Sequence, residues 1–232
     1  MKRAVAAAIV FILIVAGLRL AWHRATPPAK SHRPLVILEG NSEVDGSEND
    51  LGAQIVSDLS GSPDTREIAT SGETVDQYIE QVATEIRPLV SRRNGTVVVA
   101  AFDATNSYGL GGQSGGEVYK KYCEWADRVR AEYPKARLVV STTSFRRFQG
   151  KGQFPADPPD INNRVREGNE LLLKNAQQKF DEVVDTATYL GDDPAAFSRD
   201  LIHLHDPEKV AGVARMMKEA INRQLEADGA GK

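Results

Sequence analysis

One stretch near the start of the chain constrains its fold more than any other feature. Leu35 to Leu38 form a continuous apolar run, and Gly40, Asn41 and Ser42 follow soon after it. A short unbroken apolar run that stops at a glycine is typical of a strand covered on both faces of a parallel sheet. Ligands of open parallel sheets bind beyond the carboxyl ends of the strands. The pattern therefore predicts that the Ser42 hydroxyl lies at the edge of the sheet where such proteins carry out chemistry.

Strand-like and helix-like patterns alternate along the rest of the chain. Apolar runs predict further strands over residues 66–70, 96–102, 136–142 and 182–185. Apolar residues at helical spacing and capping signals predict helices from about residue 47 to residue 59 and over residues 74–89, 117–133, 162–179 and 207–225. Strands that alternate with helices favour right-handed crossovers and an α/β fold, a three-layer α/β/α sandwich around a parallel sheet.

The totals of the sequence limit the class of protein. At 232 residues, with 41% hydrophobic and 26% charged residues, the chain fits one globular domain with a substantial core. A formal net charge of -3 gives no reason to expect nucleic acid as a partner. The single cysteine, Cys123, excludes an intrachain disulfide and a cysteine-based metal cluster, and we expect a packed thiol there.

Three later segments carry residues that can complete a site around Ser42. A serine acts as a nucleophile only beside a base that takes its proton and donors that hold the resulting oxyanion. The segments are Ser71-Gly72, Ala104-Thr105-Asn106 and Asp200-Leu201-Ile202-His203. His203 is the first candidate base, because unperturbed imidazole titrates near pH 6.5 and accepts a proton at neutral pH. His205 is the rival base, although no acid stands three residues before it.

In their order and spacing, these segments resemble the motif blocks of the SGNH (GDSL-like) hydrolase family. The resemblance covers roughly residues 34–225 and implies a flavodoxin-like fold and ester hydrolysis through an acyl-enzyme, with an acylated envelope glycan or lipid as one possible substrate class. It implies Ser42 as the nucleophile, His203 as the base and Asp200 as the carboxylate that orients the base. It also implies an oxyanion hole formed by the backbone N–H groups of Ser42 and Gly72 and the side-chain amide of Asn106.

Two blocks depart from the family's pattern. The third block reads Ala104-Thr105-Asn106-Ser107, without the usual glycine and aspartate, and the last block has Leu201 where glycine commonly follows the aspartate. The altered third block supports an alternative function, a tethered non-catalytic or acyl-transferring module that binds an envelope glycan or lipid. Without the family resemblance, Gly72 and Asn106 would be interpreted as turn residues, and Asp200 would be interpreted as a helix-cap or turn aspartate.

The first residues of the chain predict a membrane anchor. Lys2 and Arg3 precede fifteen uninterrupted apolar residues, 4–18, and the stretch as far as Trp22 is long enough for about 28 Å of helix. We expect an uncleaved anchor over residues 1–24, a linker over residues 25–33 and the hydrolase-like domain over residues 34–228, with a cleaved signal peptide as the alternative. Basic residues after the anchor favour a cytoplasmic domain. The signal-like start and the resemblance favour an extracytoplasmic one, periplasmic or at the cell surface, and we adopt that orientation.

Two loops are candidates for contact with the substrate. Residues 108–116 contain five glycines and predict a mobile lid, because a loop with so few side chains cannot pack. A phosphate-binding loop is the alternative, although no Gly-Lys-Ser/Thr follows. Arg146 and Arg147, followed by Lys151, predict binding of a negative group such as an acidic sugar or a lipid head group, with a solvated basic loop as the alternative. No metal or other cofactor is indicated, because none of the four histidines has a second ligand at i, i+4 spacing. The sequence leaves the oligomeric state open.

Overall fold

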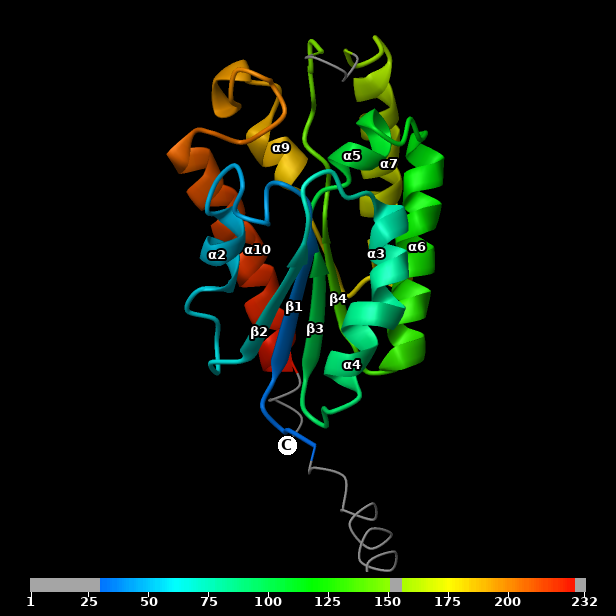
Figure 1. The fold of residues 1–232 in the computed structure, drawn as a ribbon, viewed down its shortest axis with the longest axis vertical. Helices are drawn as coiled ribbons and strands as arrows, with labels where there is room; N and C mark the ends of the chain where they lie inside the picture. Colours follow the sequence, from blue (N-terminus) through cyan, green and yellow to red (C-terminus); the bar gives the residue numbers. More distant parts are fainter. Residues whose placement is uncertain (1–29, 151–155, 228–232) are drawn as a thin grey trace, which may run out of the picture. The chain divides into compact units, whose positions relative to one another are not determined.

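The computed structural model describes residues 30–150 and 156–227, and the described residues from Ser31 onward form one compact unit. Within these residues, five parallel strands form a single sheet with the order β2-β1-β3-β4-β5 (Figure 1). In chain order the strands are β1 (Leu35–Gly40), β2 (Asp64–Ala69), β3 (Val97–Ala101), β4 (Arg137–Ser141) and β5 (Glu182–Val184). This is the flavodoxin-like order, whose topological switch point lies between β1 and β3. The predicted parallel sheet is confirmed.

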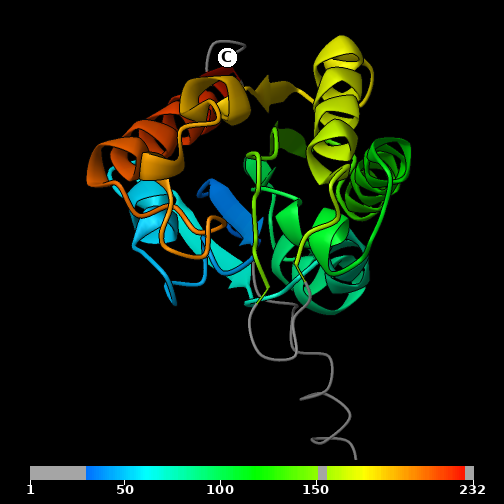
Figure 2. The same cartoon turned by 90° about the horizontal axis from the view of Figure 1, so that it is seen from above.

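Helices cover both faces of this sheet (Figures 1 and 2). One face carries α3 (Val75–Gln81), α4 (Arg87–Val90), α6 (Gly115–Glu132) and α7 (Ile161–Lys174), and the other carries α2 (Leu51–Val56) and α10 (Pro207–Ala227). Successive side chains of a strand point to opposite faces. Leu35 and Ile37 therefore pack into the first layer, and Val36 and Leu38 pack into the second. The three-layer α/β/α sandwich predicted from the sequence is confirmed over the described residues.

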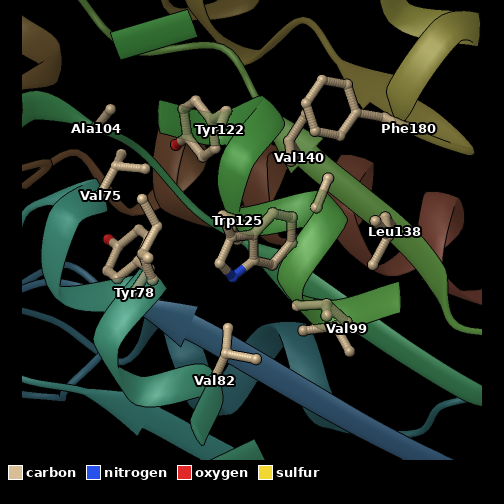
Figure 3. Close-up of a cluster of buried hydrophobic side chains, with 14 of the residues drawn as sticks. Val75, Tyr78, Val82, Val99, Ala104, Tyr122, Trp125, Leu138, Val140 and Phe180 are labelled. Carbon is tan, nitrogen blue, oxygen red and sulfur yellow. The ribbon is translucent and has the colours of Figure 1, made fainter. Parts of the chain in front are cut away.

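Aromatic side chains fill the first layer (Figure 3), and one of them contacts a buried carboxyl group. Trp125 of α6 packs edge-to-face against Tyr122, with ring centroids 6.4 Å apart, and its indole Nε1 donates to Oε2 of Glu39 over 2.6 Å. Glu39 is fully buried in β1, and its Oε1 has no hydrogen-bond partner within the described part of the chain. Burial raises the pKa of this carboxyl well above its usual range. Glu39 thus lies inside the core, where burial favours the protonated, neutral form of its carboxyl group.

Three predicted helices differ in extent from the observed ones. The pattern over residues 74–89 predicts one helix, but α3, a π-helical turn (Val82–Ile86) and α4 follow one another there. Pro88 in the first turn of α4 has no N–H for a regular helical bond, which accounts for the irregular turn before it. The pattern over residues 162–179 likewise divides into α7 and α8 (Ala176–Lys179). The helix expected from residue 47 begins at Leu51, whose N–H donates to the side chain of Asn49.

The glycine-rich segment contains more regular structure than its composition predicts. Residues Thr105–Gly109 form α5, and α6 begins at Gly115. A Cβ at Gly115 would lie 2.4 Å from the backbone nitrogen of Gly168, so this glycine allows α6 and α7 to approach closely. The prediction that residues 108–116 cannot pack is therefore wrong for Gly115, and the candidate lid is reduced to residues 110–114. Two further short elements, α9 (Thr186–Leu190) and a 3-10 turn (Pro194–Ala196), were not expected from the sequence.

The segment just before β1 contacts the domain at the amino ends of the strands. The Ser31 N–H donates to the carbonyl of Arg92, and Arg33 forms an ion pair with Asp64 at 3.1 Å. The described end of the predicted linker thus packs against the domain. Residues 30–150 and 156–227 include no helix that is both long and apolar enough to span a bilayer. The predicted anchor over residues 1–24 lies outside the described residues.

Candidate active site

A tight turn after β1 presents Ser42 at the carboxyl edge of the sheet, uppermost in Figure 1. A Cβ at Gly40 would lie 2.4 Å from the side chain of Val44, so the close approach that forms this turn requires glycine. The Asn41 carbonyl accepts the Val44 N–H over 2.9 Å, and the Asn41 side chain accepts the Glu43 N–H over 3.0 Å. The turn therefore requires Gly40 and is stabilised by Asn41. The motif Gly40-Asn41-Ser42 thus reflects the geometry of the turn as well as the family resemblance.

Ser42, His203 and Asp200 form a continuous hydrogen-bonded chain. Ser42 Oγ lies 2.8 Å from Nε2 of His203, and Nδ1 of the same ring lies 2.7 Å from Oδ2 of Asp200. Because a carboxylate only accepts, the Nδ1 nitrogen carries a proton, and Nε2 of the neutral ring is left as the acceptor for the serine hydroxyl. This arrangement can take the proton of Ser42 as the hydroxyl attacks a carbonyl.

Asp200 is held in its ionised form by several donors. Its Oδ1 accepts hydrogen bonds from the Ser198 hydroxyl at 2.6 Å, the Ile202 N–H at 3.0 Å and the His203 N–H at 3.2 Å. Burial alone would raise the pKa of Asp200, but the bonds from Ser198 and His203 and from the two backbone groups outweigh it and lower the pKa to about 2. Asp200 can therefore orient His203 and stabilise an imidazolium without taking the proton itself.

Leu201 occupies a strained backbone conformation between these two residues. Its φ is +58°, in the left-handed region that glycine adopts at little cost and a branched side chain rarely does. Leu201 therefore stands at a position whose backbone conformation favours glycine, the residue that the family resemblance implies there. The backbone geometry is kept at a conformational cost.

The rival base His205 lies away from the nucleophile. Its backbone N–H donates to the Ala196 carbonyl over 2.9 Å, and its exposed side chain lines an open cleft with Phe197 and Arg199. The structure thus brings His203, and not His205, into hydrogen-bond distance of Ser42.

Asn106 and Gly72 come from neighbouring turns at the same edge. Asn106 lies in α5 and is 9% exposed, and its side-chain Nδ2 has no acceptor among the described residues. Buried donors are almost always paired in proteins, so this amide is available to an atom from outside the described residues. Gly72 has φ +86° in the turn after β2. The Ser107 hydroxyl accepts the Val75 N–H over 2.9 Å and so joins the two turns.

Asp103 forms the turn before Asn106, where the third block lacks its usual glycine. It has φ +56°, and its Oδ1 accepts the Thr105 N–H over 2.5 Å, so the aspartate itself closes the turn that leads to Asn106. Its carbonyl accepts the Asn41 side-chain amide over 3.3 Å, which joins this turn to the Ser42 turn. Burial raises the pKa of Asp103 to about 6. The sequence shows that a motif residue is missing but not which neighbour compensates for it.

Sequence reasoning also missed Glu43, the residue after Ser42. Its side chain is 3% exposed, with Oε1 accepting the Leu204 N–H over 2.8 Å and Oε2 accepting the Asn49 amide over 2.6 Å. Burial raises the pKa of Glu43 to about 7. Glu43 therefore links the nucleophile turn to the residue after His203. A lone glutamate beside a serine carries no signal in the sequence that would identify these partners.

The two predicted substrate-binding arginines have different surroundings. Arg146 is 3% exposed, and its guanidinium donates to Asp157 at 2.8 Å and to the Thr105 carbonyl at 2.7 Å. The expectation that Arg146 lines the cleft is therefore corrected, because its charge is used inside the protein to hold α5. Arg147 is exposed and pairs with Asp192 at 3.1 Å. Its contact with a substrate stays a prediction, and Lys151 lies outside the described residues.

Several solved structures with a similar fold are named as lipases or esterases. A GDSL-like lipase from Bacteroides thetaiotaomicron is 14% identical, with a TM-score of 0.58 over 90% of this chain and 97% of that chain. A member of the lipolytic G-D-S-L family from Veillonella parvula is 18% identical, with a TM-score of 0.56 over 80% and 94%. A family 3 carbohydrate esterase from Clostridium thermocellum is 16% identical, with a TM-score of 0.56 over 83% and 99%.

No protein-family model matches the sequence, and no curated protein matches it. The structural matches confirm, at the level of the fold, the resemblance that the motif blocks indicated.

Proposed function

We propose that this protein is a serine esterase of the SGNH (GDSL-like) type, which cleaves a carboxylic ester through an acyl-enzyme. The observation that carries the proposal is the chain of hydrogen bonds from Ser42 through His203 to Asp200. The fold shared with GDSL-like lipases and carbohydrate esterases supports ester hydrolysis as the class of reaction.

The first half of the reaction uses this chain of three residues. Ser42 Oγ attacks the ester carbonyl carbon as its proton passes to Nε2 of His203, and Asp200 stabilises the imidazolium through Nδ1. The carbonyl oxygen becomes an oxyanion, held by the backbone N–H groups of Ser42 and Gly72 and by the Asn106 amide. His203 then gives its proton to the alcohol oxygen, the carbon–oxygen bond breaks, and the acyl group stays on Ser42.

The second half repeats these steps with water. His203 takes a proton from the water molecule as the water oxygen attacks the acyl carbon, and it returns that proton to Ser42 Oγ as the acid leaves. Free enzyme, an alcohol and a carboxylic acid result.

The alternative, a non-catalytic or acyl-transferring module, rests on the altered third block. The buried and unpaired Asn106 amide argues against a protein that has lost its catalytic site, because an unused buried donor is destabilising.

The test is labelling by a serine-directed phosphonate together with hydrolysis of a short-chain nitrophenyl ester, with Ser42→Ala as the control. Labelling and turnover that both depend on Ser42 support the esterase. A wild-type protein that is neither labelled nor active would contradict it.

We also propose that residues 1–24 anchor the protein in a membrane and that the catalytic domain is extracytoplasmic. The support is the apolar run of the sequence. Deleting residues 1–24 should release a soluble domain with unchanged activity on soluble esters, because nothing assigned to the site precedes Gly40. Fractionation and activity assays of the two forms check this. Aggregation of the shortened form, or loss of its activity, would show that the segment belongs to the fold.

A further inference from the structure

A cleft lies beside the loop that carries Asp200 and His203. It consists of two adjoining hollows that share Phe145, Arg147 and Asp192. Phe197 and Leu201 also line the first hollow, and Arg166 lines the second, so apolar side chains, two cations and one anion meet there. We call this the Arg147–Arg166 cleft.

The cleft is continuous with the proposed catalytic loop. Leu201 follows Asp200 directly, and its carbonyl accepts the Arg147 N–H over 3.1 Å. The Leu201 side chain lines the cleft although its φ of +58° would suit glycine better. Residues in such conformations cluster at active sites and ligand-binding segments. Leu201 thus joins the cleft directly to the loop that carries Asp200 and His203.

The two guanidinium groups are placed for an anionic ligand. Arg166 reaches from α7 over the ring of Phe145, with Cζ 5.7 Å from the ring centroid. Arg147 pairs with Asp192, but their side chains are 41% and 78% exposed. An ion pair this exposed is weak, so an anionic group can take the place of Asp192. The planar fork of arginine suits the paired oxygens of carboxylates and phosphates.

The position of the cleft favours one part of the ester. His203 gives its proton to the leaving alcohol oxygen, so the alcohol part of the ester lies towards the His203 loop. The cleft borders that loop through Leu201. A group on the alcohol part can therefore extend into the cleft while the acyl carbon stays at Ser42.

We propose that the Arg147–Arg166 cleft binds a carboxylate or phosphate group carried by the alcohol part of the substrate ester. This inference rests on the esterase function proposed above. Arg147 was already predicted from the sequence to bind an anionic group, whereas Arg166 takes the role that was predicted for the buried Arg146. The class of substrate is then an acidic glycan or a molecule with a phosphate-bearing head group.

The test compares three acetate esters whose phenolic leaving groups differ in charge. Phenyl acetate is neutral, 4-acetoxybenzoate carries a carboxylate, and 4-acetoxyphenyl phosphate carries a phosphate. The variant is the double change Arg147→Gln, Arg166→Gln, and the matched control is Arg128→Gln, which also breaks an exposed arginine ion pair but on α6. For each ester, kcat/KM of the variant is divided by that of the wild type, which cancels the differences in leaving-group reactivity.

We expect the double variant to lose about 10- to 100-fold in kcat/KM on an anionic ester and less than about twofold on phenyl acetate. The loss should shrink in 1 M salt, where charges are screened beyond about 3 Å. A loss confined to the carboxylate ester identifies an acidic glycan type of group, and one confined to the phosphate ester identifies a head-group type.

Equal losses on all three esters, or no loss on any, would overturn the cleft assignment while leaving the esterase function intact. Failure of the esterase function is seen separately, as hydrolysis of phenyl acetate that does not depend on Ser42. A loss in Arg128→Gln equal to that in the double variant would show a general effect of surface charge and would also count against the cleft.

Discussion

The two halves of the candidate site differ in how completely they are assembled. In the proton-transfer half, Ser42, His203 and Asp200 are joined by bonds of 2.8 and 2.7 Å, and Asp200 accepts three further bonds. In the oxyanion half, the Asn106 amide is buried and has no acceptor within residues 30–150 and 156–227. The first half is complete within the described residues, whereas the second has an open donor, which we propose pairs with a substrate atom.

This difference indicates where binding energy is used. A group that gains its partner only when an oxyanion forms stabilises the transition state more than the bound substrate. The proton-transfer half, by contrast, needs to be correctly oriented before the substrate arrives. Removing residues from the two halves should therefore produce different kinetic effects.

The largest effect should follow from breaking the proton-transfer half. Ser42→Ala and His203→Ala should each lower kcat by roughly 10⁴- to 10⁶-fold, and the double variant should be no worse, because nucleophile and base act as one unit. Nitrophenyl ester kinetics with the two single variants and the double variant check this. His205→Ala is the matched control, and a greater loss there than in His203→Ala would make the assignment of the base wrong.

A smaller effect should follow from the oxyanion half. Asn106→Ala should lower kcat by roughly 10²- to 10³-fold and change KM much less, because the oxyanion exists only along the reaction path. Asn94→Ala, at the opposite edge of the sheet, serves as the control. A rise in KM at unchanged kcat would show that Asn106 only shapes the pocket, and the contrast between the halves would then be lost.

Glu43 joins the nucleophile turn to the base loop, and its charge should show in the pH profile. The groups that influence its carboxyl are His203, Asp103 and the donors Leu204 and Asn49. Since burial raises the pKa of Glu43 to about 7, the carboxylate is negative at pH 8 and can stabilise the positive charge that forms in the transition state. Glu43→Gln should lower kcat/KM about tenfold at pH 8 and less at pH 6, where glutamine mimics the protonated acid.

The control for Glu43 is Glu48→Gln. Glu48 Oε2 lies 4.0 Å from Nδ1 of His203, but the side chain is 42% exposed, so its charge is screened and the change should have little effect. The same tenfold loss at both pH values in Glu43→Gln would mean that Glu43 acts through its hydrogen bonds alone and not through its charge.

The smallest effect on activity should come from Glu39, which lies outside both halves. Its pKa is raised well above 4.5 by burial, so the folded protein binds more protons than the unfolded chain as pH rises past 4.5. The free energy of unfolding therefore falls with rising pH through this window. Glu39→Gln copies the protonated form and should raise the melting temperature at pH 8, leave it nearly unchanged at pH 4, and leave kcat unchanged. A lower melting temperature at pH 8 would contradict the assigned protonation.

The sequence predicted those parts of the fold that depend on local patterns. The buried run from Leu35 to Leu38 and the run ending before Asp103 both form strands, and Ser42 and Asn106 follow them at one edge, as expected. The spacing of Asp200 and His203 predicted a pair that does lie in contact. These features succeed because strand alternation and short-range spacing need no knowledge of distant contacts.

The parts that the sequence did not predict depend on contacts between distant segments. Arg146 looked like a surface cation, but Asp157 and Thr105 enclose it. Gly115 looked like a loop residue, but its small size serves the approach of α6 to α7. Glu43 gained its role from Leu204, 161 residues along the chain. Neither composition nor periodicity carries information about such partners.

The segment before β1 and the nucleophile Ser42 lie at opposite edges of the sheet. Ser31 is bonded at the amino ends of the strands, whereas Ser42 lies beyond their carboxyl ends, so six residues of β1, or about 20 Å, separate the point of attachment from the nucleophile. An artificial attachment made ahead of Ser31 would therefore meet the domain at the edge of the sheet opposite Ser42. Immobilisation through the amino end should leave the access of a soluble ester to Ser42 unchanged.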